Sequence, residues 1–359
     1  MILCSNPKEQ YLSHQKEIDE ALSKVLKSGM YILGKEGKAF EEEFSSFVGT
    51  HYAVGVASGT DALFLSLKAL GIGTDNEVIT VSHTATATVS AIEATGAKVV
   101  FVDIEKDYFT LDVSQIEKLI TKKTKAIIAV HMYGHPCDMD KLVQIAKKYK
   151  LKLIEDCAQA SGSKYKDKEV GSIGEIGCFS FFPTKNLGAL GDGGAITTNS
   201  LEIYQKLIML RQYGWDKNRE SQFQGFNSRL DEIQAAILRV KLKYLKDDIE
   251  KRNTIASLYC KYLDKSNFIL PKVRDDSYHS YHLFVIQTEN RDDLIKLLNQ
   301  NGILAAVHYK KAVHQQANYS KNSNLVITER IGANIVSLPM YPELSEKDIL
   351  YISTLCKKF

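Results

Sequence analysis

The sequence predicts an α/β protein with a mainly parallel sheet in a large domain and a smaller α+β domain at the C-terminus. Between residues 51 and 156, short apolar runs alternate with helical patterns, which is the rhythm of β-α-β units. Several runs consist almost wholly of Val, Ile, Leu and Ala, as expected when helices cover both faces of a sheet. The length of 359 residues accommodates a large domain at 1–245 and a small one at 246–359.

Each element is predicted from its apolar spacing. The helix over 38–48, for example, places Phe40, Phe44 and Phe47 on one face. Strands are predicted at 51–56, 77–81, 98–103, 125–131, 152–156, 178–182, 281–288 and 305–308. Helices are predicted at 9–28, 38–48, 84–95, 114–121, 138–148, 201–211, 231–259, 291–300 and 328–336, and a further helix carries Leu63, Leu67 and Leu70. The stretch 211–230 has few apolar positions and is predicted to be a long functional loop.

Composition excludes several classes of partner. The formal net charge is +3, from 46 Lys and Arg against 43 Asp and Glu, with no basic stripe, so neither nucleic acid nor a membrane surface is expected. The six cysteines are scattered without a Cys-x-x-Cys pair, so neither a disulfide framework nor a metal site is expected. No apolar run is long enough for a signal peptide or a membrane span, and we expect a cytoplasmic protein.

The stretch GCFSFFPTKNLGALGDGG, residues 177–194, contains an unusual lysine. Lys185 follows a buried strand directly and lies between prolines and glycines that turn the backbone sharply. A lysine held there can have its pKa lowered by desolvation, and its neutral amine is then a nucleophile toward carbonyls. The alternative is a solvated loop lysine, and this stretch alone does not decide between the two.

Two further features are predicted at the same edge of the sheet. Asp156 ends a strand, and Ser58-Gly59-Thr60 begins a helix whose free N–H groups suit a phosphate. These residues would together suit pyridoxal 5'-phosphate. Lys185 would form the Schiff base, Asp156 would face the pyridine nitrogen, and Ser180 would complete the phosphate cradle. No dinucleotide fingerprint, P-loop, His-Glu-x-x-His or Gly-x-Ser-x-Gly motif competes with this reading, and the glycines at 191–194 lead into a strand.

The motifs VASGTDAL, EDCAQASG, SFFPTKNLGALGDGGA, GFNSRLDEIQAAIL, AVHYKKAVHQQ and SLPMYPEL resemble the DegT/DnrJ/EryC1/StrS sugar aminotransferases over essentially the whole chain. The resemblance implies the type I pyridoxal-phosphate-dependent aminotransferase fold. It also implies that Lys185 binds the cofactor and moves a proton, that Asp156 pairs with the pyridine nitrogen, and that Gln159 lies against the ring or its 3-oxygen. Together with the resemblance, the surface-lysine reading of Lys185 becomes the weaker one.

The resemblance assigns further residues to the phosphate and the sugar. Gly59, Thr60 and Ser180 would bind the phosphate, and Asn227 would reach the phosphate of the neighbouring subunit, which implies a homodimer with shared sites. The residues implied to lie near the sugar are His308 and Tyr309, with Tyr31 to Gly34 approaching from the partner subunit. His308 could equally be a hydrogen-bonded loop histidine. His83 and His131 are expected to be structural neighbours, and His314 is undecided.

The motifs around Lys185, with SGMYILGKE and RQYGW, are closest to members that aminate C3 of a dTDP-linked 3-keto-6-deoxyhexose with L-glutamate as donor. UDP-linked 3-keto sugars and C4-keto sugars remain alternatives, and Ala85 stands where many members carry a bulky aromatic residue near the ring. A pyridoxamine-dependent dehydratase would replace Lys185, so its presence argues against that reading. A non-catalytic pyridoxal-phosphate sensor is the alternative of another class.

Overall fold

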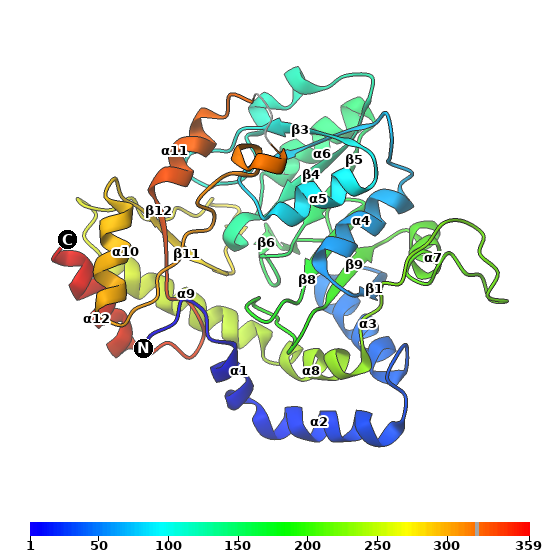
Figure 1. Ribbon diagram of the computed structural model, residues 1–359, viewed down its shortest axis with the longest axis horizontal. Helices are drawn as coiled ribbons and strands as arrows, with labels where there is room; N and C mark the ends of the chain where they lie inside the picture. The colour runs from blue at the N-terminus through cyan, green and yellow to red at the C-terminus, as the bar shows by residue number, and fades with distance from the viewer. Residues whose placement is uncertain (320–322) are drawn as a thin grey trace.

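The computed structural model describes residues 1–319 and 323–359 of the chain. Its centre is a seven-stranded sheet in the order β1-β9-β8-β5-β4-β2-β3 (Figure 1). The strands are β1 (Tyr52–Val56), β2 (Glu77–Val81), β3 (Lys98–Val102), β4 (Thr124–Val130), β5 (Lys152–Asp156), β8 (Ile176–Ser180) and β9 (Gly194–Thr198). Six of the seven run in the same direction, and β9 is antiparallel to both of its neighbours, β1 and β8. The predicted α/β class with a mainly parallel sheet is confirmed.

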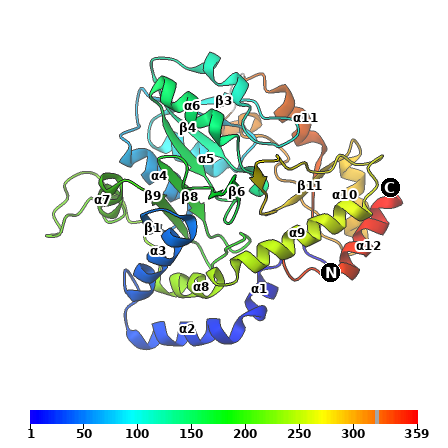
Figure 2. The ribbon, with the colours of Figure 1, turned by 180° about the vertical axis from the view of Figure 1, so that it is seen from behind.

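Helices cover the sheet, and their apolar faces form the core. The views from front and back show α4 and α5 against the sheet and α2, α3 and α8 below it (Figures 1 and 2). The helices of this part are α1 (Pro7–Ser13), α2 (Gln15–Ser28), α3 (Lys35–Val48), α4 (Gly59–Ala69), α5 (Thr86–Ala94), α6 (Met139–Tyr149), α7 (Leu201–Leu210) and α8 (Glu232–Leu242). Every strand of the sheet buries most of its residues, which explains the unbroken apolar runs in the sequence.

The C-terminal part has its own hydrophobic cluster, which includes Tyr259, Phe284 and Ile352. It contains α9 (Leu245–Tyr262), β11 (Phe284–Gln287), α10 (Arg291–Gln300), α11 (Val326–Asn334), β12 (Ile335–Leu338) and α12 (Glu346–Lys357). A small sheet of β6 (Lys164–Tyr165), β7 (Lys168–Glu169) and β10 (Ser277–Tyr278) joins this part to the first. The domain boundary near residue 245 stays a prediction.

Two predicted helices are divided in the structure. The helix predicted at 9–28 breaks at His14, whose backbone leaves the helical region and whose ring stacks on Tyr244 with centroids 4.0 Å apart. The helix predicted at 231–259 breaks at Lys243 and Tyr244. Tyr244 is the residue on which the His14 ring stacks. The two breaks therefore share one cause, because the corner of each chain segment packs against the other.

Three other predictions were wrong in detail. Residues 114–121 form two short 3₁₀ helices, η1 (Val113–Gln115) and η2 (Glu117–Leu119), and not an α-helix. Residues 305–308 form no strand, since only Ala306 pairs with Ser337. The helix predicted to end at 336 ends at Asn334, because the β-branched residues that follow pair with β11 as β12.

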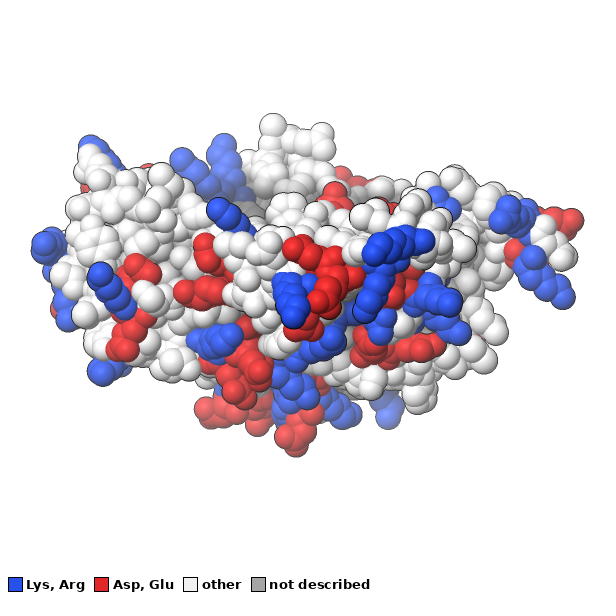
Figure 3. Space-filling view, turned by 90° about the horizontal axis from the view of Figure 1, so that it is seen from below, with Lys and Arg blue, Asp and Glu red and all other residues white. Residues whose placement is uncertain are grey.

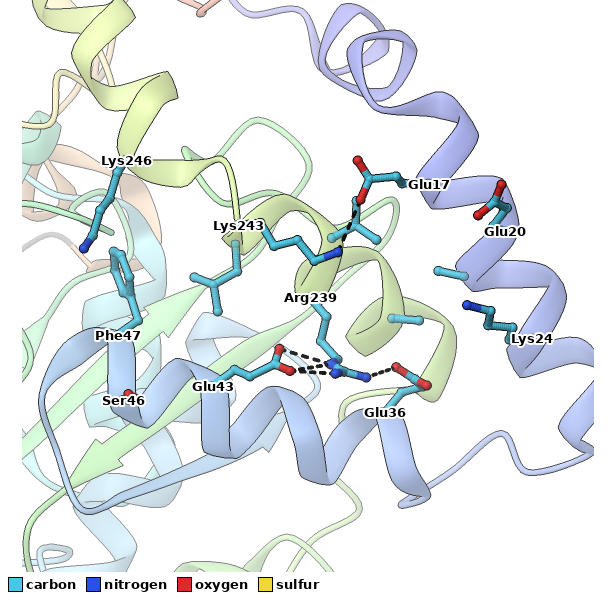
Figure 4. A pocket seen from close by; sticks show the side chains of 14 residues that line it. Glu17, Glu20, Lys24, Glu36, Glu43, Ser46, Phe47, Arg239, Lys243 and Lys246 are labelled. Atoms are coloured by element: carbon cyan, nitrogen blue, oxygen red, sulfur yellow. Dashed lines mark hydrogen bonds and ion pairs between the residues drawn. The ribbon is translucent and has the colours of Figure 1, made fainter.

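Charges on the surface are mixed in sign. The face seen from below carries basic and acidic side chains side by side (Figure 3). A groove of about 680 Å³ lies between α2, α3 and α8, where Arg239 forms ion pairs with Glu36 and Glu43 (Figure 4). None of the described helices is long and apolar enough to cross a membrane.

An aromatic cluster joins α3 to the strand that leads to Lys185. Phe44 lies edge-on to Phe179 and Phe181, with ring centroids 4.9 and 5.3 Å apart, and Phe40 lies edge-on to Phe181 at 5.3 Å. All four rings are almost fully buried. Because edge-to-face pairs add to the gain from burial, this cluster fixes β8 and the chain that leaves it.

We expect Phe44→Ala to lower the free energy of unfolding by about 3–5 kcal/mol, since it removes a buried ring with four aromatic neighbours. Denaturant unfolding of the apoprotein followed by circular dichroism measures it. Phe47→Ala is the matched control, because Phe47 on the same helix is only partly buried and should lose clearly less. Equal losses in the two variants would contradict the central role of Phe44.

Candidate active site

Lys185 lies in a tight turn just beyond β8. Its backbone N–H donates to the carbonyl of Phe182 at 2.8 Å, and a Cβ on Gly188 would lie 2.4 Å from the carbonyl oxygen of Pro183. The turn therefore requires glycine at 188. Among the described residues, the Lys185 amine has no hydrogen-bond or ion-pair partner. Burial lowers the pKa of Lys185 to about 8, while the charge of Asp156 opposes the shift.

Asp156 is the last residue of β5 and lies at the same sheet edge. Its carboxylate is buried and accepts hydrogen bonds from the Thr88 hydroxyl at 2.8 Å and from the Ala158 N–H at 3.1 Å. Burial raises the pKa of Asp156, whereas those hydrogen bonds and Lys185 oppose the rise. A buried carboxylate of this kind is stabilised by a cation placed against it, such as a protonated pyridine nitrogen.

The beginning of α4 forms an anion cradle with the end of β8. Ser58 caps the helix by accepting from the N–H of Asp61 at 3.1 Å. The N–H groups of Gly59 and Thr60 also belong to the first turn, where no helical acceptor is available. A Cβ on Gly59 would lie 2.6 Å from Cβ of Ser180, so the helix terminus and Ser180 approach closely only because residue 59 is glycine. This cradle fits a phosphate.

Gln159, His308 and Tyr309 belong to one hydrogen-bond network. The Gln159 amide donates to the Tyr309 hydroxyl at 3.1 Å, and its oxygen accepts from the Tyr133 N–H at 2.8 Å. The Tyr133 hydroxyl donates to the carbonyl of His308. Burial lowers the pKa of His308 to about 4 and raises the pKa of Tyr309 to about 12, so both side chains are neutral at pH 7.

The His308 ring bonds to the Ser337 hydroxyl at 2.9 Å through Nδ1. That bond uses only Nδ1 and leaves the role toward a sugar as a prediction. His314 bonds to Ser82 at 2.7 Å and to Glu329 at 3.1 Å, and His83 bonds to Tyr133 at 2.7 Å.

Three predicted residues lie apart from this network. Tyr31 and Gly34 belong to the loop before α3, where Glu232 accepts hydrogen bonds from the N–H groups of Gly34, Glu36 and Gly37, each at 2.8 Å. Asn227 is exposed, and its side chain has no hydrogen-bond partner in the described chain. Their roles, in sites shared between subunits, stay predictions.

Sequence reasoning missed several residues of the site. Thr88 holds Asp156, and Tyr133 links His83 to His308. His282 is buried, its Nδ1 has no hydrogen-bond partner, and Lys185 helps to lower its pKa. Tyr133 follows the end of β4, which is the signal that could have found it; Thr88, which lies on α5, and His282 carried no such signal.

His131, Glu155 and Cys157 are close enough to suggest a metal site, but two of the three already have other partners. Glu155 accepts from His131 Nε2 and from the N–H groups of Gly171, Ile173 and Gly174. His131 Nδ1 accepts from the Cys137 N–H, so that nitrogen carries no proton. The trio is a buried hydrogen-bond network that holds β5 in place.

Known proteins share this architecture over the whole chain. The crystal structure of Streptomyces venezuelae DesV, solved in complex with a ketimine intermediate, matches with a TM-score of 0.97 at 40% identity and covers 100% of this chain and 97% of that one. The structure of Bacillus subtilis NtdA with bound cofactor PMP matches with a TM-score of 0.90 at 34% identity over 97% of this chain and 82% of that one. The protein is a pyridoxal-phosphate-dependent aminotransferase. The chain belongs to the DegT/DnrJ/EryC1/StrS aminotransferase family, whose model matches residues 12–356.

Two curated relatives add to this picture. A dTDP-3-amino-3,6-dideoxy-alpha-D-galactopyranose transaminase from Aneurinibacillus thermoaerophilus is 47% identical over 94% of both chains. A UDP-N-acetyl-3-dehydro-alpha-D-glucosamine 3-aminotransferase from Acidithiobacillus ferrooxidans is 41% identical over 95% of this chain and 93% of the other.

In the apoprotein, the reactivity of Lys185 toward an acylating reagent should rise between pH 7 and 9 and then level off, because the amine is neutral above its pKa of about 8. Mass spectrometry of the labelled peptide measures the midpoint. Asp156→Asn should lower that midpoint, since the Asp156 charge favours the protonated amine. A midpoint near 10.4, the ordinary value for lysine, would contradict the buried environment.

Proposed function

We propose that the protein transfers the amino group of L-glutamate to C3 of a dTDP-linked 3-keto-6-deoxyhexose, giving the dTDP-3-amino-3,6-dideoxyhexose. The observation that carries this substrate is the 47% identity, over nearly the whole of both chains, to a transaminase of a dTDP-3-amino-3,6-dideoxyhexose. UDP-linked 3-keto and C4-keto sugars are the alternatives, and the relative that acts on a UDP-linked sugar supports the first of them.

The residues present suit the cofactor at each of its polar ends. The N–H groups of Gly59 and Thr60 and the Ser180 hydroxyl would bind the phosphate, since a helix N-terminus stabilises negative charge. Asp156 would hold a proton on the pyridine nitrogen, and Gln159 would lie against the ring. Pyridoxal phosphate supplies an aldehyde that binds amines and a ring that withdraws electrons from a bond being broken.

Lys185 would have two tasks. Its neutral amine would bind the cofactor aldehyde in the resting enzyme, and once the amino donor has displaced it, the amine would take the proton from Cα of L-glutamate. A pKa near 8 suits this exchange, because a general base works best when its pKa lies near the operating pH. The first half would release 2-oxoglutarate. In the second half, the Lys185 amine would deliver a proton to C3 of the sugar, the carbon that receives the amino group of L-glutamate, and the keto oxygen would leave as water.

The sugar would lie near His308 and Tyr309. Both are neutral at pH 7 and lie on the network that Gln159 and Tyr133 share. Neutral hydrogen-bonding groups suit an uncharged hexose, because a charge in this buried place would carry a desolvation cost.

A homodimer with shared sites is part of the proposal. Met30, Tyr31, Ile32, Phe182 and Leu190 are exposed apolar side chains. Two of these segments bond to the beginning of α8. The Tyr31 carbonyl accepts from the Glu232 N–H, and the Leu190 N–H donates to the side-chain oxygen of Gln234. Such a gathering of exposed apolar residues is typical of a subunit interface. Asn227, whose side chain has no hydrogen-bond partner among residues 1–319 and 323–359, would then reach the phosphate of the partner's cofactor.

The absorption spectrum tests the assignment. Purified holoenzyme should lose the visible band of the lysine-bound cofactor when L-glutamate is added, and the correct keto sugar should restore it. Lys185→Ala should show no such band and no turnover. A band that ignores glutamate would indicate another donor or the sensor reading, and turnover by Lys185→Ala would contradict the assignment.

Mixed dimers test the shared site. Neither Lys185→Ala nor Asn227→Ala should be fully active alone, but a mixture refolded together should exceed the activity of Asn227→Ala. One site in each mixed dimer then combines an intact Lys185 with the intact Asn227 of the other subunit. If Asn227 serves its own subunit, the mixture gains nothing.

A further inference from the structure

We propose that Lys241 and Gln10 are positioning residues for Lys185. Their side chains donate hydrogen bonds to two backbone carbonyl oxygens in the turn that carries Lys185. The inference rests on the proposed role of Lys185 as the residue that binds the cofactor. Neither residue touches the reacting groups. They act through the backbone of the turn, on the chain directly after Lys185.

Lys241 is a buried lysine without a carboxylate partner. It lies on α8 and is 3% exposed. Its amine donates to the Gly188 carbonyl at 2.7 Å and to Gln10 Oε1 at 3.0 Å. No acidic group within the described residues forms an ion pair with it, and the charges of Glu343 and Asp248 only partly offset the effect of burial on its pKa. Burial lowers the pKa of Lys241 to about 8.

A methionine would fill the same space without a desolvation cost, so the hydrogen bonds are what the lysine contributes. Two N–H bonds of the Lys241 amine donate to two acceptors, the Gly188 carbonyl and Gln10 Oε1. A neutral amine still has two N–H bonds, so it can make both hydrogen bonds. The hold on the turn therefore persists on either side of the pKa.

Gln10 completes the contact from α1. A lysine amine in its charged form only donates, so Gln10 must turn its oxygen to Lys241 and its amide group to the turn. That amide donates to the Asn186 carbonyl at 3.3 Å. Gln10 is 5% exposed, so its geometry is shielded from water. The two residues thus bind the carbonyls of Asn186 and Gly188 from one side.

The other side of the turn is held by its own chain and by Ser280. Lys185 N–H donates to Phe182, Ala189 N–H donates to Phe181, and the Asn186 amide donates to the Ser280 carbonyl at 3.0 Å. The turn is thereby fixed from two sides. Without Lys241 and Gln10, the segment after Lys185 would keep only the bonds to Phe181, Phe182 and Ser280. Lys185 could then shift, and a small displacement of a reacting group lowers the rate by a large factor.

The test compares Lys241→Met with Lys243→Met. Lys243 lies two residues on along the same chain, is exposed, and pairs with Glu17 at 3.3 Å in the groove of Figure 4. The first readout uses apoprotein, in which hydrogen exchange of the amides of Lys185 and Ala189 should speed up about tenfold in Lys241→Met and stay unchanged in Lys243→Met. This readout needs no cofactor and no substrate, so it tests the inference even if the proposed function fails.

The second readout uses holoenzyme. Lys241→Met should lower kcat about tenfold and leave KM for the sugar within about twofold. Gln10→Met should move every readout in the same direction by less, and it serves if Lys241→Met does not fold. Wild-type exchange and a wild-type kcat in a folded Lys241→Met or Gln10→Met would overturn the inference, even if stability fell, because Lys241 would then be a structural residue only.

Discussion

The parallel pairing of β5 with β8 is the constraint on which the site depends. It sets Asp156 opposite Cys178, so the carboxyl ends of both strands reach the same edge of the sheet. Asp156 ends one strand, and the other leads through Phe181 and Phe182 to Lys185. A shift of one residue in this register would turn Asp156 to the other face of the sheet and separate the two groups.

The buried edge also sets the protonation of its members. The same removal of water lowers the pKa of Lys185 and raises that of Asp156, so both groups are biased toward their neutral forms before any cofactor binds. A bound pyridine ring would reverse this bias for Asp156 by offering it a positive partner. The backbone N–H groups of Gly59 and Thr60 would stabilise the charge of a phosphate without carrying a formal charge themselves.

The sequence allowed the fold class, the sheet edge and the positions of Lys185 and Asp156 to be predicted, because strand periodicity and turn residues are local signals. The breaks at His14 and Tyr244 could not be predicted, since each depends on the stacking of the other ring. Thr88 and Lys241 escaped for the same reason: a threonine and a lysine on helices look ordinary until the partner from a distant segment is known. The roles assigned to Tyr31, Gly34 and Asn227 depend on a second subunit, which no single chain displays.

The contact between Gln10, Asn186 and Lys241 has a consequence for folding. Gln10 is 176 residues from Asn186 and 231 from Lys241 along the chain. Contacts between residues so far apart in the sequence form late in folding, because the long chain segment between them must first lose conformational entropy. During synthesis, α1 therefore leaves the ribosome long before its partners exist, and the turn that carries Lys185 reaches its final form only after two-thirds of the chain has been made.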